Sequence, residues 1–362
     1  MKKIIFITSE FPPLPGGIGN HAYFLSKYLQ NAGYSIIVLT DFREPNADNE
    51  FDKNQIFKVE RIQRNAFTYL NRIAKAFKLS YDSEIIIVSG KFSLWLGALL
   101  KLIFLSKKVI TVIHGSELKA GGKVSKLLTQ LSLKKMDKLV AVSQFTKSLI
   151  LQINPKLTIE VINNGIEIEE LEFEQLPELN FESRINLITV GNLTYRKGQQ
   201  NIIKALPFIK TKFPSIHYHC VGITTELESF TSLANKLNVL QDITFHGVLT
   251  NEKKNSLLKK CSIFCMLSSV LKNGDVEGFG IAVLEANALG LPAIGSNDSG
   301  IKDAIENYSS GILINPTDEA EFAKAIHEII SKYNDYSTNA KKWAKKFQWD
   351  VISKEYEKVI NS

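Results

Sequence analysis

Short, almost uninterrupted apolar runs limit what this chain can fold into more than any other feature. IIFI at 4–7, IIVL at 36–39 and IIIV at 85–88 contain only aliphatic or aromatic residues. Such runs are typical of parallel strands buried on both faces of a sheet. Helical stretches separate them, and this alternation predicts a doubly wound α/β fold. We expect strands over 3–8, 35–40, 84–89, 109–114, 138–142 and 159–162, with helices over 19–32, 93–105, 124–136 and 146–153.

The alternation is interrupted once, and the interruption predicts two domains. Residues 167–182 contain seven Glu and one Pro without the periodicity of a core element, so we interpret them as a linker. The 362 residues also suit about two domains. We expect a Rossmann-like domain over 1–166, a second over 183–347, and a C-terminal helix, 348–362, that crosses back to the first. Strands are expected in the second domain over 187–190, 217–221, 243–245, 263–267, 293–296 and 312–314.

The end of the chain is helical and aromatic. We expect residues 335–360 to be helical, and Trp343, Trp349 and Tyr356 in this segment require a surface to pack on.

Composition and charge narrow the class of protein. Apolar residues make up 44% and charged residues 22%, which excludes a disordered chain. Three cysteines without zinc-ligand spacing predict reduced thiols. Residues 1–165 hold 23 Lys and Arg against 12 Asp and Glu, whereas the remainder holds 21 against 25. This basic half suggests an anionic partner such as a phosphate or an acidic membrane surface, although an ordinary solvated surface explains it equally well.

Neither export nor a membrane span is expected. The apolar run near the start has only about five residues, which is short for a signal peptide. The stretch 94–105 is interrupted by Lys101 and is shorter than the ~20 residues that cross a bilayer, so we expect a buried core helix there. These features predict a cytoplasmic protein, with the cytoplasmic face of a membrane as a candidate surface for peripheral binding.

Two candidate sites lie in the first half. Pro15-Gly16-Gly17-Ile18-Gly19 follows the first strand and opens a helix, whose free N–H groups suit an anion. Its spacing departs from G-x-G-x-x-G, Asp41 is the only candidate for the acidic ribose partner, and a purely structural turn explains the loop as well. His114 ends the strand VITVIHG, at the edge of a parallel sheet where ligands bind.

The second half holds two stronger motifs. Arg196 and Lys197, in GNLTYRKG, precede a helix expected over 199–209, where cations oppose the helix dipole unless an anion lies between. An exposed basic pair is the alternative. In EGFGIAVLE, Gly278 and Gly280 precede a helix whose N–H groups, near Phe279 and Ile281, suit a phosphate. Glu277 and Glu285 suit sugar or ribose hydroxyls, unless Glu285 simply faces solvent.

Other chemistries lack their motifs. We find no metal-ligand cluster, Walker loop or Gly-x-Ser-x-Gly. Basic residues are not interleaved with aromatic ones, so we do not expect nucleic-acid binding. The remaining histidines without ligand-like spacing are interpreted as structural; these are His21, His217, His219 and His246.

Together these motifs resemble glycosyltransferase family 4 of GT-B fold. The matching segments are EFPPLPGGIGNH, VIHGSEL, VINNGIE, GNLTYRKG and EGFGIAVLEANALGLPAIGSNDSG, the last similar to the family's E-x7-E motif. The resemblance spans essentially the whole chain. It implies two Rossmann-like domains with a cleft between them, and a retaining, metal-independent transferase. A nucleotide-sugar donor (UDP- or GDP-sugar) would bind the second domain, and a glycan, lipid-linked or small-molecule acceptor the first.

The resemblance also implies roles for single residues. Glu277 corresponds to a donor-sugar contact, Glu285 to a ribose contact, and Lys197 with Arg196 to the diphosphate ligands. Gly16 and Gly17 would line the junction of donor and acceptor, and His114 would lie beside the transferred sugar. Asn192 stands where many members have Arg, which puts the number of phosphate-binding cations in question.

Three alternatives remain open at this point. The same fold would suit a nucleotide-sugar epimerase or a non-catalytic sugar-nucleotide-binding subunit. A NAD oxidoreductase is disfavoured because the dinucleotide fingerprint is not met.

Overall fold

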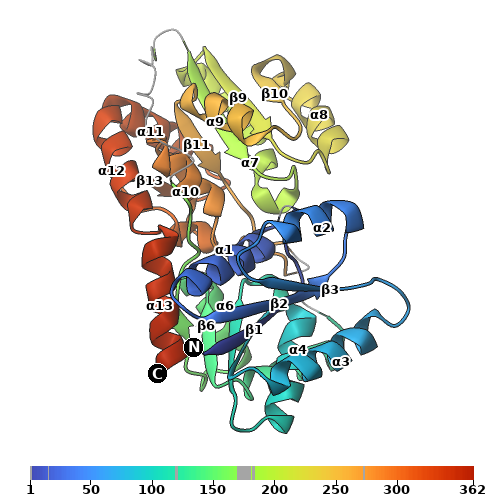
Figure 1. Cartoon of the computed structure of the whole chain (residues 1–362). Helices are drawn as coiled ribbons and strands as arrows, with labels where there is room; N and C mark the ends of the chain where they lie inside the picture. The colour runs from blue at the N-terminus through green and yellow to red at the C-terminus, as the bar shows by residue number, and fades with distance from the viewer. Residues whose placement is uncertain (1, 15, 119–120, 169–180, 182–183, 272–273) are drawn as a thin grey trace. The chain divides into compact units, whose positions relative to one another are not determined.

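The computed structural model describes residues 2–14, 16–118, 121–168, 181, 184–271 and 274–362 (Figure 1). The chain forms two compact units: unit 1 is Met1–Gly165 with Trp349–Ser362, and unit 2 is Ile166–Gln348. Most of the expected linker, 167–182, lies outside the described residues. Each unit contains one parallel sheet, so the predicted doubly wound α/β class is confirmed.

Unit 1 is built on a seven-stranded parallel sheet in the order β3-β2-β1-β4-β5-β6-β7. The apolar runs form its buried centre, where Ile4 pairs with Ile36 of one neighbour and Ile85 of the other. The strands are β1 (Lys3–Thr8), β2 (Ser35–Asp41), β3 (Lys58–Ile62), β4 (Ile85–Ser89), β5 (Lys108–Ile113), β6 (Lys138–Ala141) and β7 (Glu160–Val161). The helices are α1 (Gly17–Asn31), α2 (Pro45–Lys53), α3 (Thr68–Tyr81), α4 (Lys91–Ile103), α5 (Lys123–Leu133), α6 (Gln144–Ile153) and α13 (Trp349–Asn361).

The end of the chain is helical over 335–360, as expected, except at residues 346–348. Two helices form there: α12 (Tyr333–Lys345) belongs to unit 2, and α13 belongs to unit 1. Figure 1 shows α13, in red, alongside α1. The rings of Trp349 and Phe24 stack at 5.9 Å, and the Tyr356 hydroxyl lies 2.9 Å from His21 Nε2. Burial of these aromatic side chains against α1 explains why the last helix returns to the first unit.

Elements α2, β3 and α3 carry no apolar run and were not expected from the sequence. Strand β3 (KVERI) lies at the sheet edge and pairs only with β2 among the described strands. Its Arg61 instead forms ion pairs with Asp48 and Asp52 of α2, at 3.0 and 2.8 Å. A polar edge strand held by ion pairs does not show the pattern that marks a buried strand.

Unit 2 repeats the architecture on a six-stranded parallel sheet in the order β10-β9-β8-β11-β12-β13. The strands are β8 (Ile185–Val190), β9 (Ile216–Val221), β10 (Ile243–Phe245), β11 (Ile263–Met266), β12 (Ala293–Ser296) and β13 (Gly311–Ile314). The helices are α7 (Gln199–Lys212), α8 (Leu227–Lys236), α9 (Asn251–Lys259), α10 (Ile281–Ala288), α11 (Glu319–Ser331) and α12, with 3-10 turns η3 (Tyr195–Lys197), η4 (Leu240–Asp242) and η5 (Gly300–Asp303). Cys220, Cys261 and Cys265 are free and buried, as expected.

Each sheet contains a switch point, where the order of strands reverses direction. In unit 1 the chain runs outward from β1 through β2 and β3, and then returns to β4 on the other side. In unit 2 it runs from β8 through β9 and β10, and returns to β11. The loops after these strands diverge, so a crevice for ligands is expected at the carboxyl ends of β1 and β4, and of β8 and β11.

Candidate functional site

Two cations and one carboxylate meet at the switch point of unit 2. Lys197 Nζ lies 2.8 Å from Glu277 Oε2, and Arg196 Nη1 contacts the same oxygen. Arg196 Nε also approaches Asp275 Oδ1 at 3.7 Å. Burial raises the pKa of Glu277, but the charges of Lys197 and Arg196 outweigh burial and hold that pKa below its ordinary value. Glu277 is therefore ionised, and the exposed basic pair considered from the sequence is excluded.

The Arg196–Lys197 turn is held against the end of β11. Gly198 follows η3 with a φ of 83°, and a Cβ there would overlap the carbonyl oxygen of Leu267. Asn201 Nδ2 donates to the same carbonyl at 2.9 Å, and Ser269 N donates to Arg196 O at 3.1 Å. The loop after β8 is thus fixed to the loop after β11, which keeps both cations at the switch point.

The loop that carries Glu277 is positioned by backbone contacts. Gly300 N donates to Glu277 O at 2.9 Å, and Phe279 is buried with its ring 5.9 Å from that of Phe347. Gly280, with a φ of 94°, turns the chain into α10, which starts at Ile281 as expected. The first turn of a helix presents N–H groups without partners within the helix, so the start of α10 offers donors to an anion.

Glu285 and Asn192 lie at the margin of this arrangement. Glu285 is on α10, its side chain is 33% exposed, and its Oε2 lies 3.6 Å from Lys254 Nζ of α9. It is therefore neither fully solvated nor in contact with the cations of the switch point. Asn192 is exposed, and its backbone carbonyl accepts from Gln199 Nε2 at 3.1 Å.

The predicted site residue of unit 1 beside the strand ends is a histidine without charge. His114 follows β5, and its ring lies edge-on to that of His21 at 4.9 Å. Burial lowers the pKa of His114 to about 3, so the imidazole is neutral. Its Nε2 is buried and has no hydrogen-bond partner among the described residues. A neutral imidazole with one uncommitted nitrogen can donate to or accept from a ligand.

Glu117, to which the sequence analysis gave no role, supports His114. The Glu117 carboxylate accepts from the backbone N–H groups of His114 and Gly115, both at 3.0 Å. Burial raises the pKa of Glu117 to about 7, although these hydrogen bonds lower it. An acidic residue directly after a strand-end His-Gly-Ser was the available signal, because a carboxylate there can reach back to free backbone N–H groups.

The glycine loop after β1 leads into α1, as expected. Gly16 precedes the helix and Gly17 begins it, whereas Pro15 lies outside the described residues. Asp41, considered as a ribose partner, is instead buried in an ion pair with Arg72 at 2.9 Å.

The stretch 94–105 is only partly the buried helix that we expected. It forms α4, whose Leu94, Leu96 and Leu100 are buried, but Leu99, Leu102 and Ile103 are exposed. No helix among the described residues is long and apolar enough to cross a membrane. Within the same part of the chain, no three His, Cys, Asp or Glu side chains group as metal ligands do.

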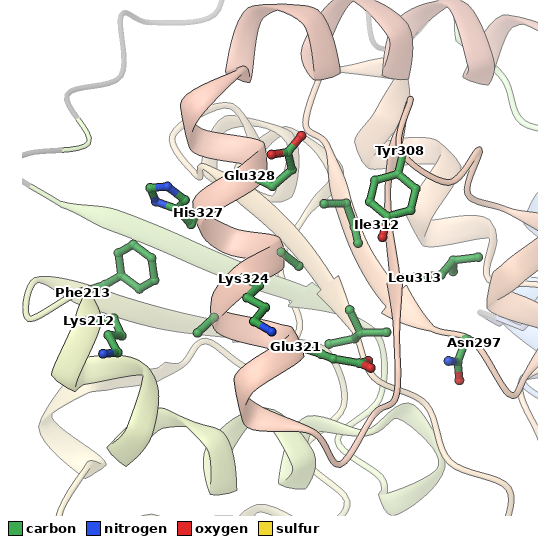
Figure 2. Close-up of a pocket in the computed structure, with 13 residues that line it drawn as sticks. Lys212, Phe213, Asn297, Tyr308, Ile312, Leu313, Glu321, Lys324, His327 and Glu328 are labelled. Atoms are coloured by element: carbon green, nitrogen blue, oxygen red, sulfur yellow. The ribbon is translucent and has the colours of Figure 1, made fainter.

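One cavity lies apart from the predicted site residues, although Asn297 of the segment EGFGIAVLEANALGLPAIGSNDSG lines it. This cavity of about 830 Å³ is bounded by β13 and α11, and Figure 2 shows Tyr308, Glu321, Lys324 and His327 around it. None of the site residues predicted from the sequence lines it. We therefore locate the candidate site at the switch points and not in this cavity.

Comparison with known proteins identifies the family. The Glycosyltransferase Family 4 model matches residues 15–170, and the Glycosyl transferases group 1 model matches residues 172–347. Together the models cover both units, so the chain belongs to the family 4 (group 1) glycosyltransferases and is an enzyme of that class.

Individual relatives agree over nearly the full length. An uncharacterised glycosyltransferase of Methanocaldococcus jannaschii is 29% identical over 99% of this chain and 98% of its own. A GDP-mannose-dependent alpha-(1-6)-phosphatidylinositol monomannoside mannosyltransferase of Mycobacterium tuberculosis is 22% identical over 91% and 89%. Anabaena HepE in complex with UDP and glucose has a TM-score of 0.81, 18% identity and full coverage of both chains. These likenesses confirm the GT-B fold.

Proposed function

We propose that this chain transfers a sugar from a UDP- or GDP-sugar to a glycan, lipid-linked or small-molecule acceptor, with retention at the anomeric carbon. Two relatives support the donor class, since one is named for GDP-mannose and another was solved with UDP and glucose. Synthesis of a polysaccharide or glycoconjugate is the corresponding role. The single observation that carries the proposal is the contact of Arg196 and Lys197 with Glu277 beside the first turn of α10.

The donor diphosphate binds at the unit 2 switch point in this proposal. Arg196 and Lys197 supply the positive charge, and the N–H groups from Gly278 to Ile281 supply further donors. Arg has five N–H donors and Lys has three, so both can hold Glu277 and a phosphate at once. Arg196 also takes the place of the arginine that many family members have at the position of Asn192.

The two glutamates hold the sugar and the ribose. Both cations contact Oε2 of Glu277, and its Oε1 is the atom that we propose accepts from a hydroxyl of the donor sugar. Glu285 accepts from the ribose hydroxyls. This role requires that the 3.6 Å contact between Glu285 Oε2 and Lys254 Nζ lengthens when the donor binds. In this proposal Glu277 contacts the sugar that reacts, whereas Glu285 contributes only to the binding of the donor.

Unit 1 holds the acceptor in this proposal. Gly16 and Gly17 let a substrate approach the backbone closely after β1. His114, neutral because burial lowers its pKa to about 3, contacts the transferred sugar through a hydrogen bond instead of a charge. An uncharged group suits this position because the reacting carbon becomes positive in the transition state.

The reaction follows from the charge distribution. The bond from the anomeric carbon to the donor phosphate breaks, and the acceptor oxygen bonds to that carbon on the same face. The acceptor proton passes to the leaving phosphate oxygen, so a nucleoside diphosphate and a glycoside result. Arg196, Lys197 and the α10 N–H groups stabilise the negative charge that develops on the leaving group. We propose that these groups make a metal ion unnecessary.

Nucleotide release measured with and without acceptor tests this function. A transferase releases nucleoside diphosphate faster when a competent acceptor is added, and the glycoside product keeps the anomeric configuration of the donor. An epimerase releases its product without an acceptor, and a binding subunit releases none. Acceptor-independent release, or inversion at the anomeric carbon, would overturn the proposal.

A further inference from the structure

Helix α5 of unit 1 has its apolar face turned outward. Val124, Leu127, Leu128 and Leu131 recur at the i, i+3, i+4 and i+7 spacing that places side chains on one helix face. Their exposed fractions are 72, 56, 41 and 49%. The opposite face buries Leu133 together with two polar residues, Thr129 and Ser132. A helix of a soluble domain ordinarily buries its leucines and exposes its hydroxyls, so this reversed arrangement calls for a partner.

The neighbouring helix shows the same feature. Trp95 of α4 donates from Nε1 to Thr129 Oγ1 of α5 at 3.1 Å, so the two helices pack directly. The second half of α4, labelled in Figure 1, exposes Leu99, Leu102 and Ile103 by 40, 54 and 51%, and Leu105 just beyond it by 72%. We call the exposed side chains of these two helices the α4–α5 apolar surface; they are Leu99, Leu102, Ile103, Leu105, Val124, Leu127, Leu128 and Leu131.

The surroundings of this surface are basic. Residues 85–136 contain nine Lys and no Asp or Glu except the buried Glu117. Some of these lysines are engaged inside unit 1: Lys101 Nζ lies 2.8 Å from Asp137, and Lys108 Nζ lies 2.7 Å from Val359 O. By contrast, Lys123, Lys126, Lys134 and Lys135 are exposed, at the two ends of α5. The charged side chains of α5 and of the two residues after it are therefore all positive.

We infer that the α4–α5 apolar surface docks on an anionic lipid bilayer. The exposed leucines suit the acyl boundary of a membrane surface, and the flanking lysines suit its acidic headgroups. The 11 residues of α5 extend only about 16 Å, so the helix lies in the interface plane. A second copy of the chain is a poorer partner, because a two-fold contact would bring the same four lysines together.

The test is co-sedimentation of the full chain with vesicles of phosphatidylglycerol and phosphatidylcholine in equal parts, against phosphatidylcholine alone. We expect binding to the anionic vesicles at about 0.1 M NaCl. Lys123→Gln/Lys126→Gln should weaken that binding roughly 20-fold, since each lysine near the surface contributes about fivefold. This difference in binding between the lysine variant and the wild type should disappear near 1 M NaCl, where charges are screened within about 3 Å. Leu127→Ser/Leu131→Ser should weaken binding about tenfold or more.

Matched substitutions in unit 2 serve as controls. Ile223→Ser/Val248→Ser removes two exposed apolar side chains, and Lys236→Gln/Lys253→Gln removes two exposed charges. Neither control should change vesicle binding, and melting temperatures should show that all variants fold. The inference is overturned if the chain ignores anionic vesicles at low salt, or if the α5 variants bind as the controls do. A dimer that Leu127→Ser/Leu131→Ser converts to monomer, without vesicle binding, would identify a second copy as the partner instead. Binding is measured without donor or acceptor, so failure here leaves the proposed transfer reaction intact.

Discussion

The predicted site residues of the two units, which follow β8 and β11 in unit 2 and β5 in unit 1, differ in charge. In unit 2, Arg196 and Lys197 contact the carboxylate of Glu277 at the ends of β8 and β11, and their charges hold the pKa of Glu277 below its ordinary value. In unit 1, burial keeps His114 neutral and raises the pKa of Glu117 to about 7. This difference suits the ligands that we propose for the two units: a diphosphate is held by fixed charge, whereas a sugar hydroxyl is held by neutral hydrogen-bonding groups.

The largest effect should come from Lys197→Ala, which removes one of the two cations. Lys197 faces charge that grows on the leaving group, so kcat should fall about 10²- to 10³-fold, more than donor KM rises. Steady-state kinetics with varied donor measures both constants. Lys210→Ala, at another ion pair of unit 2 (Lys210 with Asp242), is the control and should leave kcat near the wild-type value. If Lys197→Ala changes only KM, the stabilisation of the leaving group is wrong although the binding site stands.

Glu277→Gln should have the next largest effect. The substitution removes the negative charge that holds both cations and weakens a hydrogen bond to the moving sugar. A charged hydrogen bond contributes about 1.5–3 kcal/mol, which corresponds to a fall in kcat of about 10- to 100-fold. Discrimination between donors that differ at one hydroxyl should also decline. Competition between two such donors in one reaction measures this directly, and unchanged discrimination would remove Glu277 from the sugar subsite.

Glu285→Gln should have a smaller effect than Glu277→Gln, and it should act on donor KM instead of kcat. Because the ribose is bound alike in the ground and transition states, Glu285→Gln should raise donor KM about tenfold with little change in kcat. Lys254→Gln, which removes the observed partner of Glu285, should not raise KM if the carboxylate serves the ribose. Equal increases in KM for both variants would mean that the ion pair merely supports α10.

In unit 1, we expect the free energy of unfolding to depend on pH through Glu117. Burial raises the pKa of Glu117 above its unfolded value, so the folded state favours the protonated carboxyl. The stabilisation of the folded state by the protonated Glu117 carboxyl is fully present below about pH 4.5, and it is lost as the pH rises through about 7. Glu117→Gln removes this dependence, so at about pH 8 its melting temperature should exceed that of the wild type, by the equivalent of roughly 3 kcal/mol. Parallel stability profiles for the two proteins would show that Glu117 stays ionised.

Much of this organisation could be predicted from the sequence, because burial on both faces leaves a direct record in the apolar runs. Glycines and cations before a helix also singled out Lys197, Arg196 and Glu277, which the structure brings into contact, whereas their roles stay predictions. The sequence analysis gave no role to Glu117, although an acidic residue directly after a strand-end His-Gly-Ser can reach back to the backbone N–H groups of His114 and Gly115, as Glu117 does. The exposure of the apolar face of α5 was also not predicted. Periodicity shows that a helix has an apolar face, but it does not show whether that face packs on the sheet or faces solvent.

The central claim is that Arg196 and Lys197 bind the donor diphosphate, and titration calorimetry with a nucleoside diphosphate and its parent nucleoside tests it most directly. The pairs to use are UDP with uridine and GDP with guanosine, in the presence of EDTA. We expect the wild-type chain to prefer one diphosphate over its nucleoside. Lys197→Ala should lose about tenfold or more of that preference, with nucleoside affinity unchanged, because a charge-assisted contact is lost only for the phosphates. The same preference in both proteins, or binding that requires added Mg²⁺, would contradict the account.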